Sequence, residues 1–478
     1  MLQNCLPTRV RQKLIELPKT LDETYERVLN EIGKADGTLA RRILQCLTVA
    51  IRPLRVEELA EILALDFEEA EGRIPKFNEN WRLQDRQQAL MITCSSLIAI
   101  VDDHGSRVVQ FSHFSVKEFL TSDRLATPVR DISVFHILPE PAHAVLAQAC
   151  LAVLLLLDDS IPKDLVQSRF PLARYAARHW VDHAQFENAS LRVKDGMQQL
   201  FDQSKPHFAA WLKLYDVDLG YPITTQPHAT PLYYASLCGF RGLAEHLVNK
   251  SPQDANAEGG QRHNPLTAAL CNQHFHVAEL LRQHGAAVEL MSYNNRTLLV
   301  EGHTDAVRWL LEHGANVTPR PNNDRTSTRE VVGVPRRPSG LLYAMIDHGG
   351  SPLHLASACD HFKIMQLLIQ RGADVSARDS ENSTPLHLAS RWGVAGSMQL
   401  LIRHGADVNA RDEDGSTPLH HASSAGIAES MQLLIRYGAD VSAPNKRNVT
   451  PLHQVIRVSV KTVWLSNQHG ANVAVHGC

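Results

Sequence analysis

The sequence predicts a mainly α protein: a solenoid of short helical repeats in the second half, preceded by a small α+β domain and a helical connector. Three observations support this fold class. They are a 33-residue period, a series of amphipathic helices followed by two β-like runs, and an ordinary globular composition. Of the 478 residues, 44% are hydrophobic and 21% are charged, which suits a globular chain of several domains.

The period is set by a Ser or Thr that precedes each Pro-Leu pair. These residues fall at Ser351, Thr384, Thr417 and Thr450, at a constant spacing of 33 residues. A fixed period of this length indicates stacked helical units.

Each unit is predicted to contain two helices and a turn-rich return. Thr384 is expected to cap the first helix, with Pro385 at its first position, where the lost N–H has no intrahelical partner. Gly393 should end this helix. A second apolar stripe follows from Met398, and Gly405 should close it in the left-handed conformation.

These units closely resemble ankyrin repeats, with the T-P-L-H-x-A start and the G-A-D-V-N end of that family. The resemblance covers residues 226–478 and implies about seven repeats that bind protein partners on a concave surface. Earlier units open at Thr230, Asn264 and Thr297, and the third is four residues short.

Two parts of the solenoid depart from the pattern. The stretch "TPRPNNDRTSTREVVGVPRRPSG", within an insertion near residues 318–348, is expected to be a disordered loop or an artefact of gene modelling. The final unit has Val455, Ile456, Val458 and Val460 in its first helix, and Trp464 and Leu465 without a following repeat. We expect it to expose an apolar patch and to self-associate, or to continue in a longer natural product.

The sequence predicts no metal site and no cofactor. His354, His387, His420 and His453 occupy equivalent positions, and such residues lie about 8–10 Å apart in stacked helices, too far to share an ion. We expect them to join adjacent repeats by hydrogen bonds. The eight cysteines are scattered singly, without a CxxC pair, which favours a reducing, cytoplasmic location.

The first half begins with a predicted helix from Thr20, where Thr20 and Glu23 form a capping box. Its apolar stripe comprises Leu21, Tyr25, Val28, Leu29 and Ile32. A second helix is expected from about Thr38, and a third within "RPLRVEELAEILAL". Two β-like runs, "LIAIV" and "RVVQFS", follow around "DDHGS". Helices followed by a β-hairpin are the layout of a winged helix.

A serine next to a histidine, Ser112-His113, raises the question of hydrolase chemistry. Ser112 lacks the G-x-S-x-G setting of a nucleophile, and His113 should point to the opposite face of an extended strand. Ser115 and Glu118 instead predict a capping box that begins the next helix. We therefore expect no catalytic residues and no enzymatic activity.

This half resembles the segment that follows the nucleotide-binding core in fungal NACHT/STAND proteins, the NOD-like receptors of fungi. The matching stretches are "LPKTLDETYERVL", "RPLRVEELAEIL", "FSHFSVKEFL" and, for a helical connector, "PLARYAARHWVDHA". The resemblance implies an ATPase-module remnant at 1–34, a winged-helix-like domain at 35–125 and a connector at 126–225, followed by the repeats at 226–478.

The phosphate-binding motif of that family, G-x-x-x-x-G-K-[ST], is absent from the sequence. The only Gly-Lys pair is Gly33-Lys34, which is followed by Ala35 instead of Ser or Thr, and Val28 stands where the first glycine of the motif should be. The chain is thus expected to be a truncated paralogue or a fragmentary gene model. Nucleic acid and membrane partners are not expected. The net charge is -3, Glu57, Glu58 and Glu61 lie on the helix that would meet DNA, and the longest apolar run, 144–157, is too short for a bilayer.

The sequence therefore favours a non-enzymatic scaffold that binds a protein partner, with the truncated regulatory part of a NACHT/STAND NTPase as the alternative. Arg391 and Trp392 are the first candidate contacts, because they end a first helix and Trp and Arg are frequent binding anchors. The remaining candidates are the charged residues of the neighbouring turns: Arg378, Asp379, Glu381, Arg411, Asp412 and Asp414.

Overall fold

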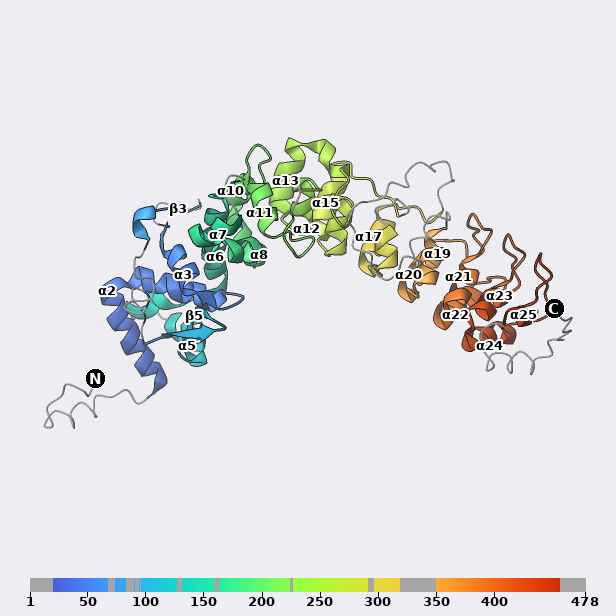
Figure 1. Cartoon of the computed structure of the whole chain (residues 1–478), viewed down its shortest axis with the longest axis horizontal. Coiled ribbons are helices and arrows are strands. Elements are labelled where there is room, and N and C mark those ends of the chain that lie inside the picture. The colour runs from blue at the N-terminus through green and yellow to red at the C-terminus, as the bar shows by residue number, and fades with distance from the viewer. Residues whose placement is uncertain are drawn as a thin grey trace. The chain divides into compact units, whose positions relative to one another are not determined.

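A computed structural model describes residues 20–67, 74–82, 90, 94, 96–126, 131–158, 163–223, 227–290, 296–318 and 350–455. The chain divides into two compact units, Met1–Ser251 and Pro252–Cys478. Both are built mainly from helices, and the β-strands found among the described residues lie in the first part of the first unit (Figure 1).

The first unit opens with one long helix, α2 (Leu21–Val49), capped by Thr20, whose hydroxyl accepts a hydrogen bond from the amide of Glu23. The expected break before Thr38 is wrong. Gly37 costs a helix only about 1 kcal/mol, and the packing of α2 against α6 (Pro139–Leu154) and η3 (Asp131–Phe135) outweighs that cost. Leu21, expected in the buried stripe, is instead 61% exposed, whereas Leu29 is fully buried.

The expected winged-helix elements are confirmed. Strand β1 (Leu54–Arg55) pairs with β5 (Ser106–Phe111), which pairs with β4 (Ile98–Asp103), so the sheet order is β1-β5-β4. Helix α3 (Val56–Leu63) follows β1, and a short hairpin of β2 (Leu65–Asp66) and β3 (Lys76–Phe77) precedes η1 (Glu79–Trp81). The β4–β5 turn has positive φ at His104 and Gly105, as a tight hairpin requires.

The start of the next helix, α5 (Phe114–Leu120), differs from the expectation. His113, rather than Ser115, is the N-cap, and its ring nitrogen Nδ1 accepts a hydrogen bond from the amide of Ser115. The cap moves two residues upstream because the strand ends at Phe111, and an aromatic ring nitrogen can serve as well as a hydroxyl oxygen in accepting the free amide.

Helix α3 is held by two buried glutamates. The carboxylate of Glu58 accepts two hydrogen bonds from the Arg52 guanidinium, at 2.8 and 2.6 Å, and a third from the amide of Arg55. Glu61 accepts a 2.6 Å bond from the amide of Leu172 in the connector. Their side chains are only 1% and 3% exposed, so the expected repulsion of DNA by this helix reduces to Glu57.

The connector is a bundle of helices, in which η2 (Asp123–Ala126) and η3 lead into α6. The apolar run from residue 144 lies within α6 and just after it, and its helical residues are largely buried, as expected for a core helix. Further helices complete the bundle: α7 (Lys163–Arg169), α8 (Ala173–Ala184), α9 (Ala189–Arg192), α10 (Lys194–Leu200) and α11 (His207–Leu214). Among the described residues, none of the helices is both long and apolar enough to cross a membrane.

An aromatic cluster joins the connector to the first repeat, α12 (Pro231–Leu237) and α13 (Arg241–Lys250). Trp180 of α8 packs edge-on against Trp211 of α11 at 5.4 Å and stacks on Phe240 at 5.5 Å. Trp211 also contacts Tyr234 of α12, and both tryptophans are fully buried. The connector thus covers a face of the first repeat that would otherwise lie open, which is the role of a terminal cap in a solenoid.

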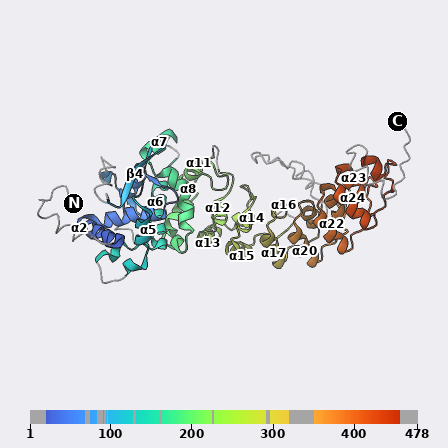
Figure 2. The ribbon, with the colours of Figure 1, turned by 90° about the horizontal axis from the view of Figure 1, so that it is seen from below.

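The second unit is a series of helix pairs, and its later pairs stack side by side (Figure 2). After η4 (Pro252–Asn256) the pairs are α14 (Pro265–Cys271) with α15 (Phe275–Gln283), α16 (Arg296–Val300) with α17 (Thr304–Glu312), α19 (Pro352–Ala358) with α20 (Phe362–Gln370), α21 (Pro385–Trp392) with α22 (Ala395–Arg403), and α23 (Pro418–Ala425) with α24 (Ala428–Arg436), before α25 (Pro451–Val455). The 33-residue units are confirmed as two-helix repeats.

The residues predicted to begin and end the repeat helices do so in α21 and α22. Thr384 caps α21, and Gly393 ends it with φ of 75°, while Gly405 follows α22 with φ of 91°. A Cβ on Gly393 would lie 2.7 Å from the side chain of Ile427 in the next repeat. Glycine is therefore required there both by the left-handed backbone and by close packing.

The recurring histidines form the expected ladder between repeats. His387 accepts the amide of Thr384 at Nδ1, over 3.1 Å, and lies 3.2 Å through Nε2 from the carbonyl of Ser416. His354 and His420 make the same two contacts in their own repeats. Because Nδ1 receives an N–H, these rings are neutral with the proton on Nε2, which donates to the following repeat.

The unusual insertion expected near 318–348 falls almost wholly outside the described residues, which resume at 350. The expected apolar patch of the final repeat likewise lies outside them, since description ends at Val455.

Candidate partner-binding surface

The predicted anchors lie at the C-terminal end of α21. Arg391 and Trp392 are both exposed, and Trp392 presents 36% of its surface. The αL turn at Gly393 ends the helix directly after them. The equivalent residues of the next repeat, Ser424 and Ala425, are small and exposed.

The neighbouring turns contain exposed arginines that bind backbone carbonyls. Arg378 donates through Nη1 to the carbonyls of Asn382 and Arg411, at 2.7 and 2.6 Å. One repeat later, Arg411 donates to the carbonyl of Pro444 at 2.8 Å. These two predicted contact residues therefore hold one turn to the next.

Two predicted aspartates shape the same turns. Asp379 accepts hydrogen bonds from the amides of Glu381 and Ser383, and Asp412 accepts one from the amide of Ser416. The other oxygen of Asp412 lies 2.8 Å from Nε2 of His421, a contact that the sequence reasoning missed. A recurring D-x-x-x-S spacing in the sequence is the signal that marks both turns.

Glu381 and Asp414 complete the predicted set as exposed side chains at the turn tips. Their backbone carbonyls accept the amides of Glu413 and Lys446 in the following turns. Asp414 also lies 3.9 Å from Arg447, where both side chains are exposed. Four of the eight candidates thus hold turns through side-chain hydrogen bonds, and of these Arg378 and Arg411 remain exposed. The other four, Arg391, Trp392, Glu381 and Asp414, are exposed as well.

The Ser-His neighbourhood of the first unit is a helix cap. Nδ1 of His113 lies 2.6 Å from the hydroxyl of Ser115, and that hydroxyl lies 2.8 Å from the phenol of Tyr25. Ser112 instead donates to the carbonyl of Ser96. The histidine therefore meets Ser115, not Ser112, and both residues serve the first turn of α5.

Two groups of side chains in the second unit have the donor types of metal ligands. One comprises Cys271, Glu301 and His303, and the other His387, Asp412 and His421. In each, the ligand atoms lie within 4.8 Å of one another. Within the second group, both ring nitrogens of His387 are occupied by backbone groups of the ladder, so it offers no free nitrogen to an ion.

Comparison with known families matches both halves. The family described as "GPI inositol-deacylase, winged helix domain" matches residues 25–130, and "Ankyrin repeats (3 copies)" matches residues 232–321, 339–412 and 395–475. The second half of the chain contains ankyrin repeats. The β-hairpin and helices of the first half form a winged-helix domain, as their layout predicts.

Two fungal proteins are similar to the chain. The "azaphilone pigments biosynthesis cluster protein L" of Monascus ruber is 32% identical over 296 residues, which cover 58% of this chain and 61% of that protein. The "ankyrin repeat protein nuc-2" of Neurospora crassa is 25% identical over 165 residues, covering 32% of this chain and 16% of that protein. The chain therefore spans less than two thirds of the length of either relative.

Proposed function

We propose that this chain is a non-enzymatic interaction protein that binds a protein partner through the ends of the first ankyrin helices and the adjacent turn tips. The single observation that carries the proposal is the exposed Trp392, which stands beside Arg391 with only small side chains at the equivalent positions of the next repeat. An exposed indole with open surroundings can fill a pocket of a partner, and Trp and Arg are enriched among residues that dominate binding energy.

The charges around this surface set the kind of partner that fits. Arg391 supplies a guanidinium beside the indole, while Glu381 and Asp414 place carboxylates on successive turns. A partner surface with an apolar pocket, flanked by a carboxylate toward α21 and by basic side chains toward the turns, is complementary to this arrangement.

Replacing Trp392 with alanine is expected to weaken capture of the partner by about 30-fold, the effect of losing roughly 2 kcal/mol at a binding hot spot. The melting temperature should change much less than capture does, because 36% of the Trp392 surface is exposed and that part adds nothing to folding. The measurement is affinity capture from cell extract with the full chain as bait, followed by titration of the captured protein against each variant.

Tyr437→Ala provides a matched control, since Tyr437 is an equally exposed aromatic residue at the end of α24. It should leave capture intact. A large loss of stability in Trp392→Ala with unchanged capture would identify Trp392 as a packing residue and overturn the proposed surface.

A second candidate function is the regulatory part of a NACHT/STAND NTPase, supported by the winged-helix match at residues 25–130 and by the helical connector that follows it. In this proposal the domains divide at residues 34, 125 and 225. Titration of the isolated chain with ATP and ADP tests for a nucleotide site: specific binding by this chain would contradict a non-enzymatic scaffold.

The proposed setting is cytoplasmic, without nucleic acid or membrane partners and with self-association through the final repeat. Cys46, Cys94, Cys150, Cys238, Cys271 and Cys359 are all free thiols, which suits a reducing compartment. The buried state of Glu58 and Glu61 removes part of the charge argument against DNA, but with a net charge of -3 the chain has no overall basic excess.

A further inference from the structure

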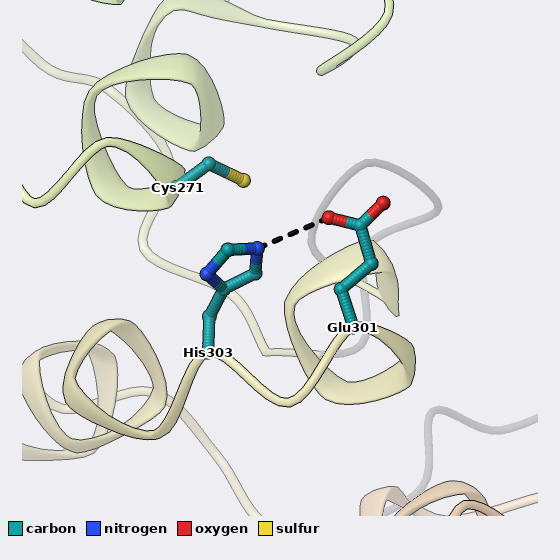
Figure 3. Close-up of side chains that lie close together, drawn as sticks. All are labelled: Cys271, Glu301 and His303. Atoms are coloured by element: carbon teal, nitrogen blue, oxygen red, sulfur yellow. Dashed lines mark hydrogen bonds and ion pairs between the residues drawn. The ribbon is translucent and has the colours of Figure 1, made fainter.

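Three side chains of the second unit converge in the repeats that open at Asn264 and Thr297, the second of which is four residues shorter than the regular unit. Cys271 ends α14 in one repeat, and Glu301 and His303 lie between α16 and α17 in the next. Figure 3 shows the thiol, the imidazole and the carboxylate directed toward one another. Their ligand atoms lie within 4.8 Å of one another, and Nε2 of His303 is 3.0 Å from Oε2 of Glu301.

We propose that Cys271, Glu301 and His303 bind a zinc ion that joins these two ankyrin repeats. A sulfur, an imidazole nitrogen and a carboxylate oxygen are the donors that zinc takes in proteins, at bond lengths of about 2.0–2.3 Å. Tetrahedral bonds of this length place ligand atoms roughly 3.5 Å apart. Nε2 of His303 and Oε2 of Glu301 already lie 3.0 Å apart, so a small rotation that brings the Cys271 thiol closer to both completes the site. The fourth position is left for water.

The backbone between the two ligands fixes their placement. Gly302 has φ of 79°, and a Cβ there would lie 2.7 Å from the ring of His361 in the following described repeat. His361 in turn contacts the carbonyl of Val300 through Nε2 at 2.8 Å. This turn therefore holds the side chains of Glu301 and His303 on one side of the chain, next to the end of α14.

The surroundings of the three residues also suit an ion. The Cys271 side chain is buried, whereas the Glu301 carboxylate is 39% exposed and so gives an ion access from solvent. Arg262 donates to Oε2 of Glu301 at 2.5 Å. Hydrogen bonds from outer residues to a ligating carboxylate commonly orient it in metal sites.

An ion at this position would add stability to a repeat that has a short first helix. Helix α16 has five residues, whereas its counterparts α14 and α19 have seven, so this repeat offers a shorter first helix for packing. A metal bound by both neighbours stabilises the folded state by its binding free energy, because the unfolded chain does not preorganise the ligands.

The proposal is tested with the purified full chain, freed of metal and titrated with Co²⁺ and Zn²⁺ alone. Cobalt should bind with a thiolate-to-metal charge-transfer band and should be displaced by zinc. Zinc should raise the melting temperature, and a chelator should reverse the rise. In Cys271→Ser the band should disappear and zinc affinity should fall by about 100-fold or more.

Cys359→Ser is the matched control, because Cys359 is another free thiol of the second unit, outside the cluster. Glu301→Gln, on the exposed side of the site, serves as a second variant should Cys271→Ser fail to fold; it should weaken zinc binding while leaving the apo melting temperature close to wild type. Cobalt binding without a thiolate band overturns the proposal. So does a band that survives Cys271→Ser or is lost in Cys359→Ser, or a zinc affinity unchanged in Glu301→Gln.

Discussion

Replacing Arg52 with methionine is expected to lower the free energy of unfolding of the first unit by about 3 kcal/mol or more. The reason is the partner that remains. The Glu58 side chain is 1% exposed, and its carboxylate accepts hydrogen bonds from both terminal nitrogens of the Arg52 guanidinium. In the variant this carboxylate would stay buried without a countercharge. Methionine retains an apolar stem near the Tyr175 ring, over which the guanidinium lies at 4.9 Å.

Urea unfolding of the full chain, followed through the transition of the first unit, measures this loss. The double variant Arg52→Met/Glu58→Leu should recover most of it, because an apolar pair of similar volume leaves no buried charge. Arg27→Met is the control, since the Arg27–Glu31 pair is exposed and 3.7 Å apart, and its loss should cost less than about 1 kcal/mol. Equal losses in Arg52→Met and Arg27→Met would contradict the assigned role of the buried pair.

The ankyrin unit is expected to lose stability as the pH falls below about 6.5, because its ladder histidines must remain neutral. Burial lowers the pKa of His387 to about 3, with a smaller contribution from His421, while the bond to the Ser416 carbonyl opposes the shift. Burial also lowers the pKa values of His354 and His420. A second proton on His387 would sit on Nδ1, which faces the amide of Thr384.

The sign follows from the protons bound in each state. Between about pH 6.5 and the lowered folded pKa, the unfolded chain binds more protons than the folded chain, so stability is complete above this window and falls with falling pH through it. For His387 alone, the loss between pH 7 and pH 4 is roughly 2–4 kcal/mol.

The measurement compares unfolding free energies of wild type and His387→Gln at several pH values. The variant should be less stable at pH 7 but should lose less on acidification, so the difference between the two proteins narrows. His104→Gln, at a fully exposed ring, should leave the slope as in wild type. A difference between wild type and His387→Gln that is constant from pH 7 to pH 4 would contradict the neutral ladder.

The features that the sequence could predict are those encoded over short distances. The helix caps at Thr384 and Thr417, the glycine ends and the hairpin around His104-Gly105 depend on neighbouring residues, and the structure confirms them. The continuity of α2 could not be predicted, because it depends on packing against α6, roughly a hundred residues later in the chain.

The candidate sites likewise include residues whose role depends on sequence neighbours and residues whose role depends on distant parts of the chain. The exposure of Trp392 follows from its place before a helix-ending glycine, which is visible in the sequence. The structural roles of Arg378 and Arg411 were not visible, because their acceptors are backbone carbonyls of the next turn, which every residue possesses. The cluster of Cys271, Glu301 and His303 could not be predicted, because its members occupy non-equivalent positions in two irregular repeats.

The bonds between successive turns have a consequence for how such a chain changes length over generations. Arg378, His387 and Arg411 each donate to a carbonyl of the following repeat, at a position fixed by the 33-residue spacing. A gene duplication that copies one whole unit supplies a new set of donors together with the matching acceptors, and every bond is restored. An insertion of another length between one of these donors and its acceptor places the donor opposite the wrong carbonyl. Evolution can therefore add or remove complete repeats without breaking these bonds. The exposed residues between the bonded positions can meanwhile change and so recognise different partners.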